Sequence, residues 1–537
     1  MTARWRAWWP EAALLAAMVA WRGLWLARDA FPLHGDEAVV LLMARHILRG
    51  ARPVFFYGQA YMGSLDAYLV AGAFALFGES LAVARGVQVA LYGLLLALTA
   101  WGVRRAWGPR VARWVLLYLA VPPVLLTIYT TVTLGGYNEA LLLGTAGLLW
   151  ATYGLPRVHP RAVARHGLGL GVLVGLGAWV LPLSWVYLGP AGWAAWQRWR
   201  SGGRRAAVAG MAAGLAGVAL GLLPVAAFVW QRGWAALMAE MPTRAYPHFM
   251  RPWWRGIPWH ALLLITAGWP AVAGLRAPWT WDWAVPLVWG WAVLLVHAGL
   301  QAAGLARWGR RAWRDLWPAV AVVNGLLFVF TPYGGDPTGR YFLPWAHATA
   351  VVLALGLAAW PRFRARNALL VGLLLTHAAV TARVAATPGG LSPVFLPSLR
   401  TDAAAQRALR DFLLEHDLTT GYTHYWVAYP LAFLSGEALR YSPRLPYHED
   451  LRYTPRDDRI PAYTRAAACA SRVAYVTSAG QRALNDRLRT ALAQAGLAWR
   501  EAQVGPYVVY YDLTRPIPPW ELGLSPRPQE VACGAQP

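Results

Sequence analysis

The chain has 537 residues, of which 58% are hydrophobic and 33 are tryptophan, and its mean hydropathy is +0.36. Several apolar runs reach the roughly 20 residues that a helix needs to cross a bilayer, which excludes an ordinary soluble protein. The 49 basic residues are all arginine and outnumber 25 acids, which gives a formal charge of +24. Because most arginines lie in short clusters between apolar runs, we attribute this charge to cytoplasmic loops of a membrane protein and not to nucleic-acid binding.

The first apolar run begins near Glu11, after a basic start. Trp21, Arg22 and Gly23 interrupt it, and it lacks the small-residue cleavage site of a signal peptide. We therefore interpret it as a retained first span with the N-terminus in the cytoplasm.

Further apolar segments follow along the chain. The candidate spans lie at 11–27, 81–103, 111–131, 136–153, 167–182, 184–197, 205–229, 280–303, 315–331, 342–360 and 367–386. The arginine clusters between them are expected to face the cytoplasm. The sequence thus predicts an α-helical polytopic protein of the plasma (inner) membrane with about eleven transmembrane helices.

One apolar segment, 257–276, does not fit this alternation. Crossing the membrane there would reverse the side of every later arginine cluster. Because Gly268, Trp269 and Pro270 interrupt the segment, we expect it to be re-entrant or to lie along the outer surface.

Acids divide the chain into two regions, since 11 of the 25 lie in 1–386 and the other 14 in 387–537. We expect a transmembrane domain over 1–386, with a long first outer loop at 28–80, and a soluble α/β domain outside the membrane over 387–537. The expected elements of that domain are helices at 401–417 and 481–496, a strand at 472–478 and paired strands within 499–513. It also contains both cysteines, Cys469 and Cys533, so one disulfide formed after export is an option.

The first outer loop opens with FPLHGDEAVV, which places His34 beside two adjacent carboxylates, Asp36 and Glu37. The residues that follow indicate an amphipathic helix on the membrane surface, with one apolar stripe formed by Val39, Val40, Met43 and Ile47. The two acids have an ordinary interpretation as first-turn residues favoured by the helix dipole. Their placement at the water boundary of an acid-poor domain favours a catalytic role instead, in which Asp36 is the first choice as general base and Glu37 the second.

Other outer-face residues are candidates for substrate binding. This set comprises His34, Tyr57, Gln59, Tyr61, Asp66, Asn138 and Glu139. The alternatives are interfacial anchoring for the aromatic residues and helix capping for Asn138 and Glu139.

A late outer loop, GGDPTGRYFLP, carries Arg340 and Tyr341 at the mouth of a span. An arginine can hold a phosphate through two parallel hydrogen bonds, and a tyrosine can donate a third. Arg251 and Arg255 form a second cationic pair near the outer interface. The alternatives are snorkelling of Arg340 to the headgroups and membrane anchoring of the tryptophan-rich stretch around the second pair.

This order of features resembles the membrane glycosyltransferases of the GT-C superfold, in particular the protein O-mannosyltransferase and aminoarabinose transferase group (glycosyltransferase family 39). The resemblance covers roughly residues 1–386, and HGDEA, YGQAYMG, GGYNEA and GRYFLP are its sharpest local matches. It implies a polyprenyl-phosphate-linked sugar as donor and transfer to an acceptor outside the membrane, with inversion at the anomeric carbon. It also implies that Asp36 is the catalytic carboxylate and that Arg340 and Tyr341 are ligands of the lipid phosphate.

Some relatives use a lysine of the first outer loop near the donor phosphate, but this chain has no lysine. Arg45, Arg49 or Arg52 would have to supply that charge. Adjacent residues of a helix point about 100° apart, so Asp36 and Glu37 are poorly placed to share one metal ion. We therefore expect chemistry without a cofactor, with a divalent metal as the alternative.

Two other functions share these features. One is a flippase or transporter of lipid-linked sugars, which would carry ionisable residues along a path at mid-membrane. The other is a surface polymerase or ligase that joins preassembled glycans carried on a lipid diphosphate.

Overall fold

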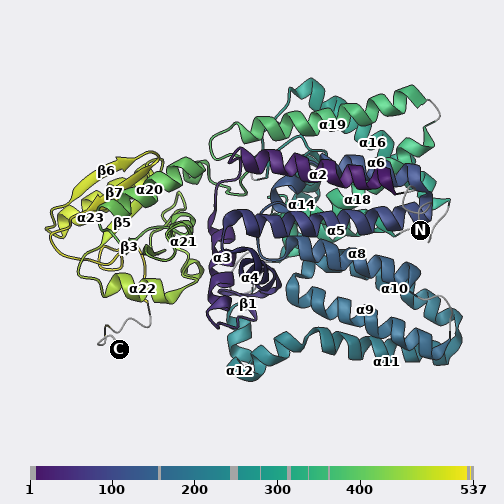
Figure 1. Ribbon diagram of the computed structural model, residues 1–537, viewed down its shortest axis with the longest axis horizontal. Coiled ribbons are helices and arrows are strands. Elements are labelled where there is room, and N and C mark those ends of the chain that lie inside the picture. Colours follow the sequence, from purple (N-terminus) through teal and green to yellow (C-terminus); the bar gives the residue numbers. More distant parts are fainter. Residues whose placement is uncertain are drawn as a thin grey trace.

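The computed structural model describes residues 8–154, 159–241, 252–278, 280–310, 316–336, 338–360, 363–528 and 533. Helices, many of them long, make up most of the described residues up to Ala385, and a smaller α/β domain lies at one end of this bundle (Figure 1). The N-terminal end of the described chain lies at the opposite end of the bundle from that domain (Figure 1).

Each range predicted to span the membrane contains a helix. In the first half these are α2 (Trp9–Ala27), α5 (Leu81–Trp107), α6 (Pro109–Ala120), α7 (Val124–Tyr129), α8 (Tyr137–Tyr153), α9 (Pro160–Val180), α10 (Trp185–Ser201), α11 (Gly203–Gly221) and α12 (Leu223–Ala239). In the second half they are α16 (Leu287–Gly309), α17 (Trp317–Val329), α18 (Leu343–Ala359) and α19 (Phe363–Ala385).

Two predicted spans are not single straight helices. The range 111–131 is divided into α6 and α7, because Pro122 and Pro123 cannot donate the backbone hydrogen bonds that would continue α6. The range 205–229 is divided into α11 and α12, which form a bent pair at 53° to each other.

Five helices of the described chain are long and apolar enough to cross a membrane, or six if the bent pair α11–α12 is one span. These five are α5, α9, α16, α18 with the turn before it, and α19. The protein is therefore a multi-pass membrane protein. The larger number of about eleven spans stays a prediction, since several of the remaining helices are shorter.

The segment 257–276 contains one helical run, Ile257–Val272, that is irregular because of a π-helical turn inside it. It consists of α14 (Ile257–Leu263), one π-helical turn (Leu264–Gly268) and α15 (Trp269–Val272). The interruption lies next to Gly268 and Pro270, as expected, while the position of the segment relative to a bilayer stays a prediction.

The first outer loop contains α3 (Gly35–Leu48), β1 (Phe55–Phe56), β2 (Gln59–Gly63) and α4 (Leu65–Phe77). Helix α3 lies across the end of the bundle, between it and the α/β domain (Figure 1). The predicted helix is confirmed, but its predicted amphipathic character is wrong, because every residue from Ala38 to Ala44 is buried. The reason is that α4 packs against one side of α3 and α21 (Tyr425–Leu434) of the C-terminal domain against another.

The C-terminal domain contains a five-stranded sheet in the order β4-β3-β5-β7-β6. Its strands are β3 (Thr420–Tyr422), β4 (Arg440–Ser442), β5 (Ala474–Ser478), β6 (Arg500–Val504) and β7 (Tyr507–Tyr511). Strand β3 is parallel to β4 and β5, and β7 is antiparallel to β5 and β6. The other helices are α20 (Ala403–Glu415), α22 (Pro461–Ala468) and α23 (Arg482–Gln494). The helices, strand and strand pair predicted here are confirmed, whereas β3, β4, α21 and α22 were not foreseen.

Alternation along β5 directs successive side chains to opposite faces of this sheet. Tyr475 packs with α23 in one apolar cluster, and Val476 packs with α20 in another. Cys469 and Cys533 form a disulfide, which ties the end of the described chain back to the domain.

Candidate functional site

The site is built around the N-terminus of α3. His34 is the N-cap residue, with extended backbone angles, and its Nδ1 accepts a hydrogen bond from the backbone N–H of Glu37 at 3.4 Å. Burial lowers the pKa of His34, so the imidazole ring is neutral at pH 7. One nitrogen of a neutral ring carries no proton and can accept a hydrogen bond. His34, a candidate substrate ligand, therefore acts in this structure as the cap that sets the direction of the next two carboxylates.

Asp36 and Glu37 lie in different surroundings, as expected for neighbours about 100° apart on a helix. Glu37 is fully buried and accepts two hydrogen bonds from Arg85 of α5, each of 2.9 Å. Asp36 is only half-buried, and its Oδ1 accepts a hydrogen bond of 2.5 Å from the hydroxyl of Tyr425. Because both oxygens of Glu37 are taken up by Arg85, we assign it a structural role and leave Asp36 as the candidate catalytic carboxylate.

Arg340 lies in a short 3₁₀ turn before α18. Tyr137 connects its side chain with the surroundings of Asp36. The Nε of Arg340 donates to Asp336 at 2.8 Å, and the Tyr137 hydroxyl also forms a side-chain hydrogen bond with Arg340. Tyr137, at the start of α8, lies within electrostatic range of Asp36 as well. The sequence did not single out Tyr137, which connects the two sides of the site.

The C-terminal domain adds charged groups to the same place. Arg459 is buried and donates to the backbone carbonyls of Tyr57 and Gly58 at 3.3 and 3.1 Å. It lies within electrostatic range of both Asp36 and Asp457. Burial raises the pKa of Asp457 to about 7, although the charge of Arg459 acts in the opposite direction.

Three of the candidate substrate ligands form one buried cluster behind α3. The Asp66 carboxylate accepts hydrogen bonds from Gln88 at 2.8 Å and from the backbone N–H of Gly135 at 3.0 Å. The Asn138 amide donates to the Gln88 side chain at 2.7 Å, and Glu139 is buried beside Asp66. This network joins α4, α5 and α8, so it fixes the start of α8, where Tyr137 lies.

Tyr57 belongs to a second network, which runs between α3 and the C-terminal domain. Its hydroxyl pairs with His46 at 3.1 Å, and His46 pairs with Glu437 at 3.0 Å. Burial alone would raise the pKa of Glu437. The hydrogen bonds from His46 and Tyr463 and the charge of Arg45 lower it to about 2.

The arginines expected to replace a lysine of the first loop are mostly engaged elsewhere. Arg45 pairs with Glu79, and Arg49 with Glu437 at 2.6 Å, while Arg52 is exposed. Among the other candidate ligands, Gln59 is buried, and Tyr61 lies under Arg456 with the guanidinium 6.0 Å from the ring centroid.

The remaining phosphate-binding candidates differ in position. The Tyr341 ring lies 5.1 Å from the guanidinium of Arg340, so this pair stays together. Arg255 is exposed, and Arg251 lies outside the described residues. The predicted pairing of Arg251 with Arg255 therefore stays a prediction.

Comparisons with known proteins bear on the fold. No family model and no curated protein matches the chain. The crystal structure of ArnT from Cupriavidus metallidurans bound to undecaprenyl phosphate is similar over 96% of this chain and 99% of that chain, with a TM-score of 0.57 and 13% identity. The same protein in the apo state is similar over 98% and 100%, with a TM-score of 0.54 and 14% identity.

The chain has the GT-C fold. The resemblance predicted from the sequence is confirmed at this level, and because it extends over 96% of the chain it includes the C-terminal domain as well as the helices. AglB from Archaeoglobus fulgidus, in complex with an inhibitory peptide and a dolichol-phosphate, is a more distant match over 91% of this chain and 71% of that one, with 12% identity and a TM-score of 0.46.

The donor set around Asp36 in this GT-C fold is mixed in charge. No group of three or more His, Cys, Asp or Glu side chains suited to a metal ion occurs in the described ranges. Tyr425, Tyr137 and Arg459 face Asp36, and so do His34 and Asp457, two residue types that can bind divalent cations. Independence from metal ions stays a prediction.

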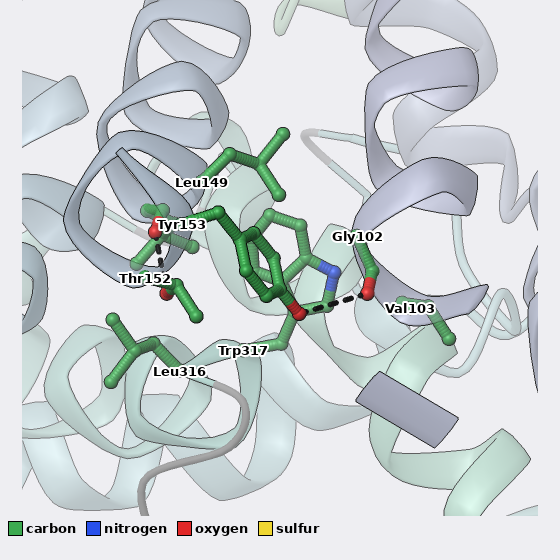
Figure 2. A pocket seen from close by; sticks show the side chains of 8 residues that line it. Gly102, Val103, Leu149, Thr152, Tyr153, Leu316 and Trp317 are labelled. Carbon is green, nitrogen blue, oxygen red and sulfur yellow. Dashed lines mark hydrogen bonds between the residues drawn. The ribbon is translucent and has the colours of Figure 1, made fainter. Parts of the chain in front are cut away.

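A small pocket elsewhere in the fold is lined by residues of α5 and α8 and by Leu316 and Trp317 (Figure 2). The Tyr153 hydroxyl donates to the carbonyl of Gly102 at 3.3 Å across it (Figure 2). Tyr153 is 16 residues along α8 from Tyr137, or about 24 Å at 1.5 Å per residue. This pocket is therefore at the other end of the helices and takes no part in the site.

The sequence did not point to Tyr425, Asp457 or Arg459. Two weak signals accompany them, the aromatic run THYWVAYP (423–430) and the charged run RDDRIP (456–461), in which two acids lie between two arginines. Neither segment has a residue spacing typical of a functional site, because the residues with which they interact lie almost 400 positions away in the sequence.

Proposed function

We propose that this protein is an inverting glycosyltransferase that moves a sugar from a polyprenyl-phosphate donor to an acceptor at the outer face of the plasma (inner) membrane. Asp36 is the catalytic carboxylate, and Arg340 with Tyr137 and Tyr341 receives the phosphate of the donor. The observation that carries the proposal is the arrangement of Asp36, a half-buried acid held by Tyr425, within electrostatic range of Tyr137, which in turn contacts Arg340.

The chemistry follows from the charges of these groups. The acceptor oxygen forms a bond to the anomeric carbon, the bond from that carbon to the phosphate oxygen breaks, and the electron pair leaves with the lipid phosphate. Asp36 takes the proton of the acceptor hydroxyl, a role worth about 10²- to 10⁴-fold in rate. Arginine and tyrosine donors stabilise the departing phosphate, and attack from the opposite side inverts the anomeric carbon.

Arg340 already has an anionic partner, Asp336, in this structure. A planar guanidinium has five N–H donors, so it can keep that carboxylate and still offer donors to a phosphate. The donor phosphate would then add to the pair instead of replacing it. Asp336 serves to hold the guanidinium in place.

The orientation rests on two features. The arginine clusters between spans predict their own placement in the cytoplasm. The disulfide Cys469–Cys533 is typical of an oxidising compartment, which supports an extracytoplasmic C-terminal domain. Similarity to ArnT bound to undecaprenyl phosphate supports a lipid-phosphate donor.

The test uses purified protein in detergent with radiolabelled polyprenyl-phosphate sugars and a membrane extract as the source of acceptor. We expect sugar to move from the lipid to extract components, with EDTA leaving the rate unchanged. Asp36→Asn should lower the rate about 10²- to 10⁴-fold. Transfer by this variant at the wild-type rate would refute the assignment of the base.

The same experiment separates the alternatives. A flippase moves the intact donor across a vesicle bilayer without breaking the sugar–phosphate bond, so the label would stay on the lipid. A polymerase or ligase would release a long glycan from a lipid diphosphate and would leave the single-sugar donor unused.

A further inference from the structure

We propose that the C-terminal domain completes the active site and that Tyr425 is a positioning residue which fixes the orientation of the Asp36 carboxylate. This inference rests on the proposed function, and it gives the domain a part in the transfer reaction itself. It applies to the side chain of one tyrosine and its hydroxyl, not to the domain interface in general.

The approach of Tyr425 to α3 depends on Gly35. A Cβ atom on Gly35 would lie 2.6 Å from Cε1 and 2.8 Å from Cδ1 of the Tyr425 ring, so no larger residue fits there without moving the ring. The missing side chain lets the tyrosine hydroxyl come within 2.5 Å of Asp36 Oδ1.

The hydroxyl of Tyr425 acts as a donor. Burial and the adjacent Asp36 both raise the pKa of Tyr425, so the phenol stays protonated in the working range of pH. A neutral donor to one carboxylate oxygen leaves the other oxygen free, and it stops the carboxylate from rotating. A carboxylate with one oxygen fixed can direct the other toward a proton on an incoming hydroxyl.

Contacts at both ends of α3 fix the position of the C-terminal domain along this helix, and with it the position of Tyr425. Gln406 exchanges two hydrogen bonds with the backbone of Leu33, just before the helix. Glu437 pairs with His46 and Arg49 at the far end. The register of Tyr425 against Asp36 is therefore set by contacts on either side of it.

A neighbouring tyrosine shows what a purely structural hydroxyl does in the same helix. Tyr429, one turn along α21, donates to the backbone carbonyl of Asp457 at 2.7 Å and accepts from the backbone N–H of Arg459. Its partners are backbone atoms of its own domain. The hydroxyl of Tyr425, in contrast, reaches across to the one half-buried carboxylate of α3.

Several charged or titratable groups face Asp36 besides Tyr425. They are His34 and Glu37 next to it in the chain, Tyr137 of α8, and Asp457 and Arg459 of the C-terminal domain. All of these stay unchanged when only the hydroxyl of Tyr425 is removed. A change in the pH profile of that variant therefore reports the lost hydrogen bond.

The test compares Tyr425→Phe with Tyr475→Phe in the full-length protein. Tyr475 is a matched control, because its buried hydroxyl donates to the carbonyl of Ile517 within the same domain, away from α3. We measure kcat, the KM for the polyprenyl-phosphate sugar, the pH dependence of kcat/KM and the unfolding temperature of each variant.

We expect Tyr425→Phe to unfold near the wild-type temperature and to lose about 10- to 100-fold in kcat with little change in KM. The acid limb of its profile should move to higher pH, because the ionised carboxylate has lost a donor. The Tyr475→Phe variant should keep the wild-type kcat and profile. Gly35→Ala, which displaces the ring, should reproduce the kinetic change by an independent route.

A wild-type kcat and pH profile in Tyr425→Phe would overturn the positioning role while leaving the proposed function intact, provided that Asp36→Asn is inactive. Full activity of Asp36→Asn would instead remove the catalytic carboxylate, and with it the proposed function. If Tyr425→Phe does not fold, wild-type kinetics in Gly35→Ala would overturn the positioning role, and Asp36→Asn would still test the proposed function.

Discussion

The two adjacent acids of α3 should respond in opposite ways to loss of charge. Glu37→Gln leaves Arg85 without its counter-charge at a site where the side chains are 0% and 6% exposed. Removing one partner of such a pair costs about 3–5 kcal/mol. Asp36→Asn leaves a half-buried amide that can still accept from Tyr425, so its cost in stability should be about 1 kcal/mol or less.

The assay measures thermal unfolding in detergent by tryptophan fluorescence and sugar transfer at a temperature where every variant is folded. Glu37→Gln should unfold several degrees earlier, and combining Glu37→Leu with Arg85→Leu should restore most of the lost stability, since no buried charge is left unpaired. Asp36→Asn should unfold near the wild-type temperature but fail to transfer sugar. A stable Glu37→Gln with activity as low as that of Asp36→Asn would refute this division of roles.

Three further predictions concern other parts of the structure. Arg340→Ala should raise the KM for the lipid-phosphate donor more than Arg340→Lys does, because lysine keeps the charge but not the planar set of hydrogen-bond donors. Steady-state kinetics of both variants checks this prediction. The pKa of Glu437 is lowered to about 2 in the folded protein, against 4.5 in the unfolded chain, so its ionised form stabilises the fold above pH 4.5. This contribution is lost as the pH falls toward 2. Thermal scans of wild type and Glu437→Gln should therefore differ at pH 7 and converge at low pH. Reducing Cys469–Cys533, with a sequence separation of 64, should destabilise the C-terminal domain by at most about 4 kcal/mol, which a melting curve with and without reductant would show.

The parts of this fold that the sequence predicted are those with local signals. Apolar runs placed the helices, and periodicity placed α20, α23 and the β6–β7 hairpin with its turn at Gly505 and Pro506. The composition boundary near residue 387 separated the two regions. Each of these features depends on residues within about one element of each other.

The burial of helix α3 was predicted incorrectly. Its stripe of apolar residues predicted a surface helix, but α21 covers the face that was assigned to water. Because α21 itself reads as a short apolar segment within a polar tail, nothing in the sequence of either helix indicates that they pack together. Tertiary contact overrode the local pattern.

For the same reason, the sequence predicted only the residues that the membrane bundle and its loops contribute to the candidate site. Asp36 and Arg340 each stand out by position, since acids are rare in 1–386 and GRYFLP lies at the mouth of a span. Their connection through Tyr137, and the contact of Asp36 with Tyr425 across 389 positions, depend on the assembled structure. Single-sequence patterns do not encode such pairings.

The placement of the charges on α3 explains why the helix needs partners from both sides. Glu37 turns toward α5 and is neutralised there by Arg85, which anchors the helix to the membrane bundle. Asp36 turns the other way, and no arginine pairs with it directly among the ion pairs of the described chain, so its direct partner is the hydroxyl of Tyr425, while Arg459 lies farther away. A carboxylate held by a tight ion pair would be a poor base, whereas one held by a single hydroxyl remains able to take a proton. The difference between these two neighbours is therefore a difference in partners, and in the proposed mechanism the hydroxyl that leaves Asp36 able to take a proton comes from the C-terminal domain.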